Sequence, residues 1–144
     1  MSGYEWVHCD NFRIPHNALK CGQDLDRSDI YIGLSSYMGD ELPCKVIPAR
    51  REAYVSHSEK EIKVNQFKIL VEKKPSWVYD ENGRVPQGAV PAGRTVSGET
   101  LYVGRKIVNN VTYVGKVHPS HRCMYAPYDG KEEAFRQYEV LAFK

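Results

Sequence analysis

The chain contains two copies of one sequence unit, and this internal repeat constrains its fold more than any other feature. When residues 6–70 are placed against residues 77–141, at a constant offset of 71, the two segments align without a gap and 18 of the 65 positions are identical. Two copies are too few for an open solenoid, which needs three or more units to bury its stacked faces. We therefore expect residues 1–144 to form a single pseudo-symmetric domain, in which repeat one (6–70) and repeat two (77–141) cover each other's apolar faces.

Apolar residues in both repeats recur mostly at every second position, which is typical of β-strands rather than helices. Residues 30–34 (IYIGL) and 101–105 (LYVGR) are short runs of β-forming residues that carry a glycine, as at a bulge or a close backbone approach. Residues 131–138 (KEEAFRQY) could begin as a helical turn, but the matching segment of repeat one looks extended, so we expect a strand. The predicted fold is all-β, with two tandem pseudo-symmetric repeats of roughly five short antiparallel strands each forming one sandwich-like or barrel-like domain.

Two local features predict where the strands turn or bend. The pair Asn-Asn at residues 109–110 separates two apolar runs and predicts a hairpin, and the pair Gly-Asp at residues 39–40 stands at the same place in repeat one. Between residues 61 and 71 the alternation changes phase near residues 65–66. This change predicts a bulge or register change in the strand.

The composition is that of an ordinary soluble globular protein. Its net charge of +2 does not favour binding to nucleic acid or to an acidic membrane surface, so we expect no nucleic acid as a partner. No window of 18 residues is apolar, so we expect no transmembrane segment. The first residues show no basic segment followed by an apolar run, which favours a cytoplasmic protein without a signal peptide. Cys9, Cys21, Cys44 and Cys123 do not recur between the repeats, and we expect free thiols.

Three groups of residues resemble a phosphate-binding loop, a metal site or a catalytic nucleophile, but none meets the requirements of such a site. Gly115-Lys116 lacks the earlier glycine and the following hydroxyl residue that a phosphate-binding loop requires. His118, His121 and Cys123 offer three ligands, whereas structural zinc usually takes four in recognisable pairs, so no metal or other cofactor is expected. No local signature surrounds a nucleophile, and an enzyme is therefore disfavoured.

Lys45 and Lys116 are more informative, because they recur one repeat apart and each is followed by valine and, two positions later, by proline. One interpretation is a solvated lysine on an exposed strand. The other is a pair of symmetry-related ligand contacts. A lysine beside aspartate and tyrosine can donate to hydroxyl groups while the carboxylate accepts from them, as in a site for a neutral sugar. Asp24, in a turn after Gly22, could reach the strand of Lys45, whereas Thr95 takes its place in repeat two.

Four motifs together resemble the DM-nine repeat, which occurs in tandem in invertebrate proteins and in the lectin-like part of natterins. They are the tryptophan, proline and alanine that occur once in each repeat (Trp6, Pro15 and Ala18; Trp77, Pro86 and Ala89), LYVGR at 101–105, GKVHPSH at 115–121 and PYDGKE at 127–132. Repeat two fits closely. Repeat one departs from the pattern at Leu34, at Cys44 and in the segment SHSEKE.

The resemblance implies an all-β domain of two intertwined repeats without a known enzymatic role. It further implies metal-independent recognition of mannose-type glycans by a pattern receptor of innate immunity. The family's sugar contacts fall on Asp24 and Lys45 here, with Lys116 as the lysine of the second repeat.

A second hypothesis is an intracellular protein-interaction or vesicle-trafficking adaptor that responds to infection without sugar specificity. The missing signal peptide favours it, since glycans lie mostly outside the cytosol. A homodimer through edge strands is plausible for either function. Vesicle association or unconventional secretion would reconcile a lectin with the cytoplasmic prediction.

Overall fold

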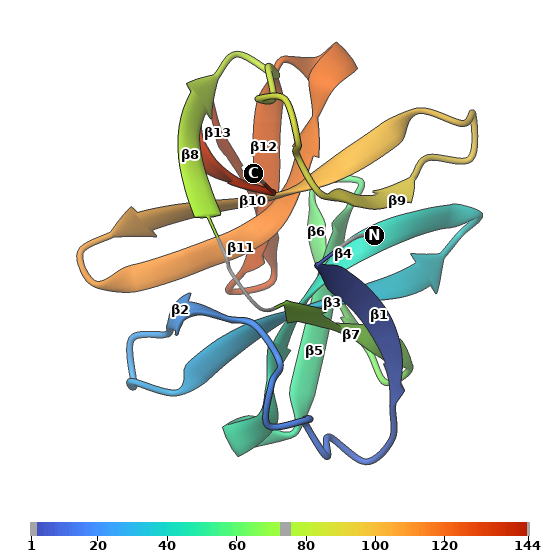
Figure 1. Cartoon of the computed structure of the whole chain (residues 1–144), viewed down its shortest axis with the longest axis vertical. Helices are drawn as coiled ribbons and strands as arrows, with labels where there is room; N and C mark the ends of the chain where they lie inside the picture. The colour runs from blue at the N-terminus through green and yellow to red at the C-terminus, as the bar shows by residue number, and fades with distance from the viewer. Residues whose placement is uncertain (1–2, 73–75, 144) are drawn as a thin grey trace.

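The computed structural model describes residues 3–72 and 76–143, and its regular structure is almost entirely β (Figure 1). Every strand pair is antiparallel, as the alternating pattern predicts, so the all-β prediction is confirmed. Repeat one contributes β1 (Tyr4–Cys9), β2 (Lys20–Gln23), β3 (Asp29–Tyr37), β4 (Asp40–Ile47), β5 (Glu52–His57), β6 (Lys60–Val64) and β7 (Phe67–Glu72). Repeat two contributes β8 (Ser76–Glu81), β9 (Pro91–Arg94), β10 (Thr100–Val108), β11 (Val111–His118), β12 (Cys123–Tyr128), β13 (Lys131–Phe135) and β14 (Gln137–Ala142).

The two repeats have the same element order, including a single 3-10 turn before β5 and β12: η1 (Pro48–Arg50) and η2 (Pro119–His121). Within the described ranges each repeat holds seven strands, so the expected five per repeat was too few. The strands β1 and β2, with their counterparts β8 and β9, were not among the predicted strands. The segment VEKKPS at residues 71–76, with Pro75 as its breaker, predicts a short linker between the repeats, and its residues 73–75 lie outside the described residues.

The predicted hairpin at residues 109–110 is confirmed, since Val108 pairs with Val111 across that turn. In repeat one the turn lies one residue earlier than predicted, at residues 38–39, because Tyr37 pairs with Asp40. The prediction of a bulge or register change within one strand at residues 65–66 is wrong. The chain leaves the sheet there, and β6 and β7 pair with different neighbours.

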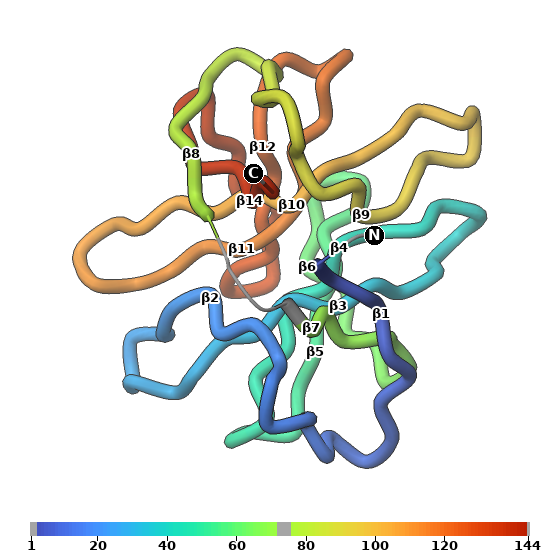
Figure 2. The backbone as a smooth tube through the Cα atoms, viewed as in Figure 1, coloured from blue at the N-terminus to red at the C-terminus, as the bar shows by residue number. Residues whose placement is uncertain are grey.

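The strands form one continuous sheet whose order is mirrored about its centre. Along the path β1-β7-β3-β4-β5-β6-β13-β12-β11-β10-β14-β8, each strand of repeat one stands opposite its counterpart in repeat two. The two halves meet where β6 pairs with β13, with Lys60 opposite Lys131. The hairpins β3–β4 and β10–β11 project to opposite sides of the molecule (Figure 2).

The main core is shared by the two repeats, as a pseudo-symmetric domain requires. Ile30 and Leu70 of repeat one pack in one buried cluster with Val103 and Leu141 of repeat two. The four cysteines are buried and free. No helix among the described residues is both long enough and apolar enough to cross a membrane.

Candidate functional site

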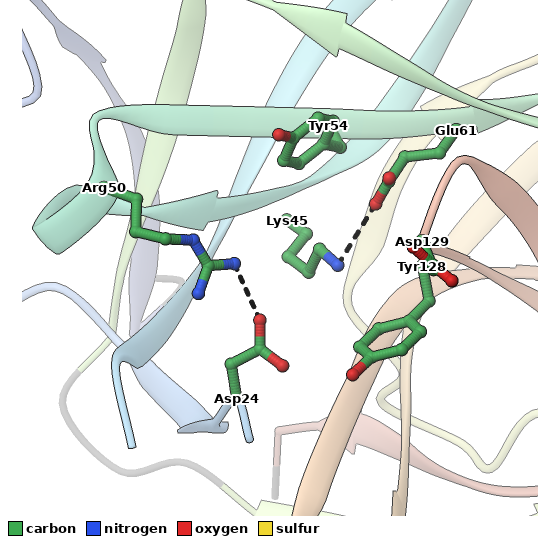
Figure 3. Close-up of a pocket in the computed structure, with 7 residues that line it drawn as sticks. All are labelled: Asp24, Lys45, Arg50, Tyr54, Glu61, Tyr128 and Asp129. Carbon is green, nitrogen blue, oxygen red and sulfur yellow. Dashed lines mark hydrogen bonds and ion pairs between the residues drawn. The ribbon is translucent and has the colours of Figure 1, made fainter. Parts of the chain in front are cut away.

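A cavity of about 440 Å³ opens where the two repeats meet (Figure 3). Repeat one supplies most of its wall and repeat two supplies the opposite side. The lining residues are Asp24, Lys45, Arg50, Tyr54 and Glu61 from repeat one and Tyr128 and Asp129 from repeat two. The structure therefore brings Asp24 and Lys45, two of the three predicted site residues, to one cavity.

Lys45 lies in the wall of this cavity with its stem buried in β4, and only 2% of the residue is exposed. Its Nζ donates a hydrogen bond of 2.7 Å to the carbonyl oxygen of Pro127 and lies 3.3 Å from Oε2 of Glu61. Burial lowers the pKa of Lys45, and the carboxylate of Glu61 opposes that shift. An ammonium group has three N–H donors, so these two partners leave one donor for a ligand.

Asp24 is held on one side of Lys45 by the guanidinium of Arg50, at 2.7 Å (Figure 3). Arg50 stands at the end of η1 and also pairs with Asp26 at 2.9 Å and with Glu52 at 3.2 Å. The other oxygen of Asp24 accepts the backbone N–H of Leu25 at 2.7 Å. These contacts fix the carboxylate at the cavity while leaving it able to accept further hydrogen bonds.

Two tyrosine rings flank the ammonium group of Lys45. The Nζ atom lies 5.6 Å from the ring centre of Tyr54 and 5.0 Å from that of Tyr128. Burial and the nearby Glu52 raise the pKa of Tyr54 to about 12, and burial and Asp24 raise the pKa of Tyr128. Both hydroxyl groups therefore keep their protons near neutral pH.

Lys116 does not line this cavity, but it repeats the contacts of Lys45 with the repeats exchanged. Its Nζ donates 2.8 Å to the carbonyl oxygen of Ser56 and lies 3.3 Å from Glu132, with the ring centre of Tyr125 at 5.6 Å. Ser56 and Pro127 occupy equivalent positions of the two repeats. Because both lysines are buried, the alternative of a solvated lysine on an exposed strand is wrong for Lys45 and for Lys116.

Around Lys116 the polar groups differ from those around Lys45. His121 takes the place of Arg50, and its Nδ1 lies 2.9 Å from the hydroxyl of Tyr125. Thr95 takes the place of Asp24, and its hydroxyl contacts Ser97 at 2.9 Å. Among the described residues around Lys116, no pair therefore corresponds to the Asp24 carboxylate held by the Arg50 guanidinium.

The three possible metal ligands His118, His121 and Cys123 lie in η2 or next to it. His118 stacks on His121 with ring centres 3.6 Å apart, and its Nε2 lies 3.0 Å from Glu99. Glu99 also accepts the backbone N–H and the hydroxyl of Ser120. In the part of the chain that the structure describes, no three histidine, cysteine or acidic side chains are placed to hold a metal ion.

Sequence reasoning missed five of the seven lining residues. Tyr54 and Glu61 carried a usable signal, since Tyr125 and Glu132 repeat them at the same offset. Arg50 is replaced by histidine in repeat two and left no such trace. Tyr128 and Asp129 reach the cavity across the interface between the repeats, which the linear sequence does not display.

Comparison with known proteins agrees with this architecture. The sequence model of the family described as "DM9 repeat" matches residues 24–135. Natterin-4 of Thalassophryne nattereri is 31% identical over 147 residues, covering 97% of this chain and 34% of natterin-4. Natterin-3 of the same fish is 32% identical over 92 residues, covering 61% of this chain and 23% of natterin-3. The chain thus spans about a third or less of each relative.

The nematode sperm cell motility protein MFP2B has a similar fold. Its crystal structure matches with a TM-score of 0.66 over 100% of this chain and 46% of the nematode chain, at 13% sequence identity. At that identity the likeness concerns the fold alone. The family match covers most of the two repeats, including the segments of Asp24, Lys45 and Lys116. The chain therefore belongs to the DM9 repeat family.

Proposed function

We propose that the chain is a metal-independent, non-catalytic carbohydrate-binding protein, and that its ligand is a mannose-type glycan held in the cavity of Asp24 and Lys45. A carboxylate that accepts and an ammonium group that donates are the complementary pair that sugar hydroxyls need. The rings of Tyr54 and Tyr128 add apolar faces and two hydroxyl groups. The observation that carries the proposal is this convergence of Asp24, Lys45 and two tyrosines in one cavity.

The charges of the cavity favour a neutral ligand. Lys45 and Arg50 are positive and Asp24, Glu61 and Asp129 are negative, so an anionic ligand would find no excess of positive charge. The two cations are already paired with carboxylates at 3.3 Å and 2.7 Å. A neutral polyol can use the remaining hydrogen-bonding capacity without breaking either pair.

We further propose that binding of mannose-type glycans serves innate immune recognition, as the resemblance to DM9 lectins implies. A shallow sugar site binds weakly, and several sites held together raise the apparent affinity. A homodimer would double the sites. The terminal strands of the sheet path, β1 and β8, each pair with one described neighbour and offer an edge for such pairing.

A glycan array followed by calorimetric titration with mannose tests the proposal. We expect Asp24→Asn to weaken mannose binding by about tenfold or more, because a neutral amide accepts hydrogen bonds less strongly than a carboxylate. Asp26→Asn is the matched control, since it also removes one negative partner of Arg50 but does not line the cavity. No binding to any mannose-type glycan, or equal loss in both variants, would refute the proposal.

A further inference from the structure

A second hollow of about 680 Å³ adjoins the Lys45 cavity, and Asp24 lines both. It lies between the β2–β3 loop of repeat one and the β10–β11 hairpin of repeat two, which run close together in Figure 1. The loop contributes Leu25 and Arg27, and the hairpin contributes Ile107, Asn109 and Asn110. We call this hollow the hairpin groove.

The pseudo-symmetric end of the molecule, where the β9–β10 loop meets the β3–β4 hairpin, is closed more tightly. There, the backbone of Glu41 in β4 pairs with that of Arg94 in β9 as in a β-ladder. The two backbones come so close that a Cβ on Gly93 would clash with the carbonyl oxygen of Glu41. In addition, Oδ1 of Asp40 accepts the backbone N–H of Val96 at 2.6 Å, which ties the hairpin to the loop.

At the hairpin groove these closing contacts are replaced. Thr112 stands where repeat one has Glu41, and its side chain fills the space beside Gly22. The backbone N–H of Gln23 in β2 donates a hydrogen bond of 3.1 Å to the hydroxyl of Thr112 in β11. The Thr112 side chain therefore lies between these two strands. Val111 stands where repeat one has Asp40, and its side chain cannot accept a hydrogen bond from the loop. The groove is therefore built by specific differences between the repeats.

The groove offers both polar and apolar groups to a ligand. Among the described residues, the side-chain amides of Asn109 and Asn110 and the guanidinium of Arg27 have no hydrogen-bond partner. Leu25 is 72% exposed and Ile107 is 50% exposed, so both the loop and the hairpin also offer apolar surface to the groove. A pyranose ring presents hydroxyl groups along its edge and C–H groups on its face, so it matches this combination.

We propose that the hairpin groove is a second sugar subsite, so that the ligand is a neutral oligosaccharide of two or more units. One unit lies in the Lys45 cavity and the next lies beyond Asp24 in the groove. This inference rests on the proposed carbohydrate binding and adds the length of the glycan. The volumes of the cavity and the groove both fall within the range of small-ligand sites.

Calorimetric titration of the full chain with mannose and with a linear mannotriose tests the subsite. We expect mannotriose to bind the native chain about tenfold or more tightly than mannose, because only the longer sugar reaches the groove. The variant Asn109→Gly/Asn110→Gly removes both amides, and glycine accepts the positive φ angles of 51° and 67° at these positions. It should bind mannotriose about as weakly as mannose while its affinity for mannose stays unchanged.

Met38→Gly is the matched control, since Met38 is the equivalent of Asn109 at the closed end and also has a positive φ, of 53°. This variant should keep the preference for mannotriose. Equal affinities of the native chain for mannose and mannotriose would overturn the subsite. So would an asparagine variant that loses affinity for both sugars by the same factor. Either result would leave mannose binding by the native chain in place. A chain that binds neither sugar would instead refute the proposed function, and the subsite with it.

Discussion

Lys45 in repeat one donates a hydrogen bond of 2.7 Å to the backbone carbonyl oxygen of Pro127 in repeat two. Lys116 makes the reciprocal bond of 2.8 Å to Ser56, the repeat-one counterpart of Pro127. The two lysines therefore join the repeats across their interface. This structural role explains why lysine recurs in both repeats, and it does not require that each lysine binds a ligand. Lys45 alone combines the role with a place in the described cavity.

Loss of the Lys116 ammonium group should destabilise the protein strongly. Lys116→Met leaves Glu132, whose side chain is only 6% exposed, without its cationic partner. We expect the free energy of unfolding in urea to fall by about 3–5 kcal/mol, as for other broken buried ion pairs. The double variant Lys116→Met/Glu132→Gln should recover part of this loss, because its amide oxygen can still accept the backbone N–H of Glu59. A loss below about 1 kcal/mol in the single variant would contradict the structural role.

Mild acid should weaken the fold through His118. Burial is the main cause that lowers the pKa of His118 below its ordinary value of 6.5, and His121 and Lys116 act in the same direction while Glu99 opposes them. The unfolded chain therefore takes up this proton first as the pH falls. The contribution of neutral His118 to the free energy of unfolding is fully present above pH 6.5. It is lost as the pH falls from that value through the lowered pKa of the folded state.

His118→Ile is the natural test of this pH dependence, since Ile47 fills the equivalent buried position of repeat one. Urea unfolding at about pH 7.5 and about pH 5.5 should show a smaller loss of stability on acidification in the variant than in the native chain. An unchanged pH dependence would mean that His118 is not the group responsible.

Cys21 and Cys44 should be inert toward alkylation in the folded protein. Burial raises the pKa of Cys21 to about 12, with Arg105 opposing, and burial also raises the pKa of Cys44. Thiolates are the reactive form, so iodoacetamide should label neither residue under native conditions at about pH 8 and both in urea. Mass spectrometry of the two samples measures this directly. Rapid labelling of Cys44 in the native state would show that β4 is not packed as described.

The repeat, the all-β class and the turn at residues 109–110 could be predicted from the sequence because each leaves a local signal. Apolar alternation marks β3 and β10, and the 71-residue offset relates the two halves. The strands β2 and β9 were missed because KCGQ and PAGR are short and carry no alternation. The change of phase at residues 65–66 was assigned to a bulge or register change within one strand, since periodicity alone cannot show that two strands pair with different neighbours.

The candidate site was predicted only in part, for a similar reason. Lys45 was chosen from its recurrence in repeat two and Asp24 from the turn after Gly22, the family resemblance implied the same two residues, and the structure brings them to one cavity. Tyr128 comes from the other repeat, so its contribution depends on how the halves exchange contacts. The burial of Lys45 and Lys116 was also hidden, because lysine is ordinarily an exposed residue and only the partner carboxylates make its burial possible.

A crystal structure of the protein soaked in mannose would show where the sugar binds. We predict a sugar in the cavity at the interface of the repeats, with hydroxyl groups within hydrogen-bonding distance of the Asp24 carboxylate and of Lys45 Nζ. Asp24→Asn crystals soaked in the same way should show weaker density or none. A sugar bound elsewhere on the molecule, or a cavity that stays empty when mannose binds in solution, would show that Asp24 and Lys45 do not form the sugar site.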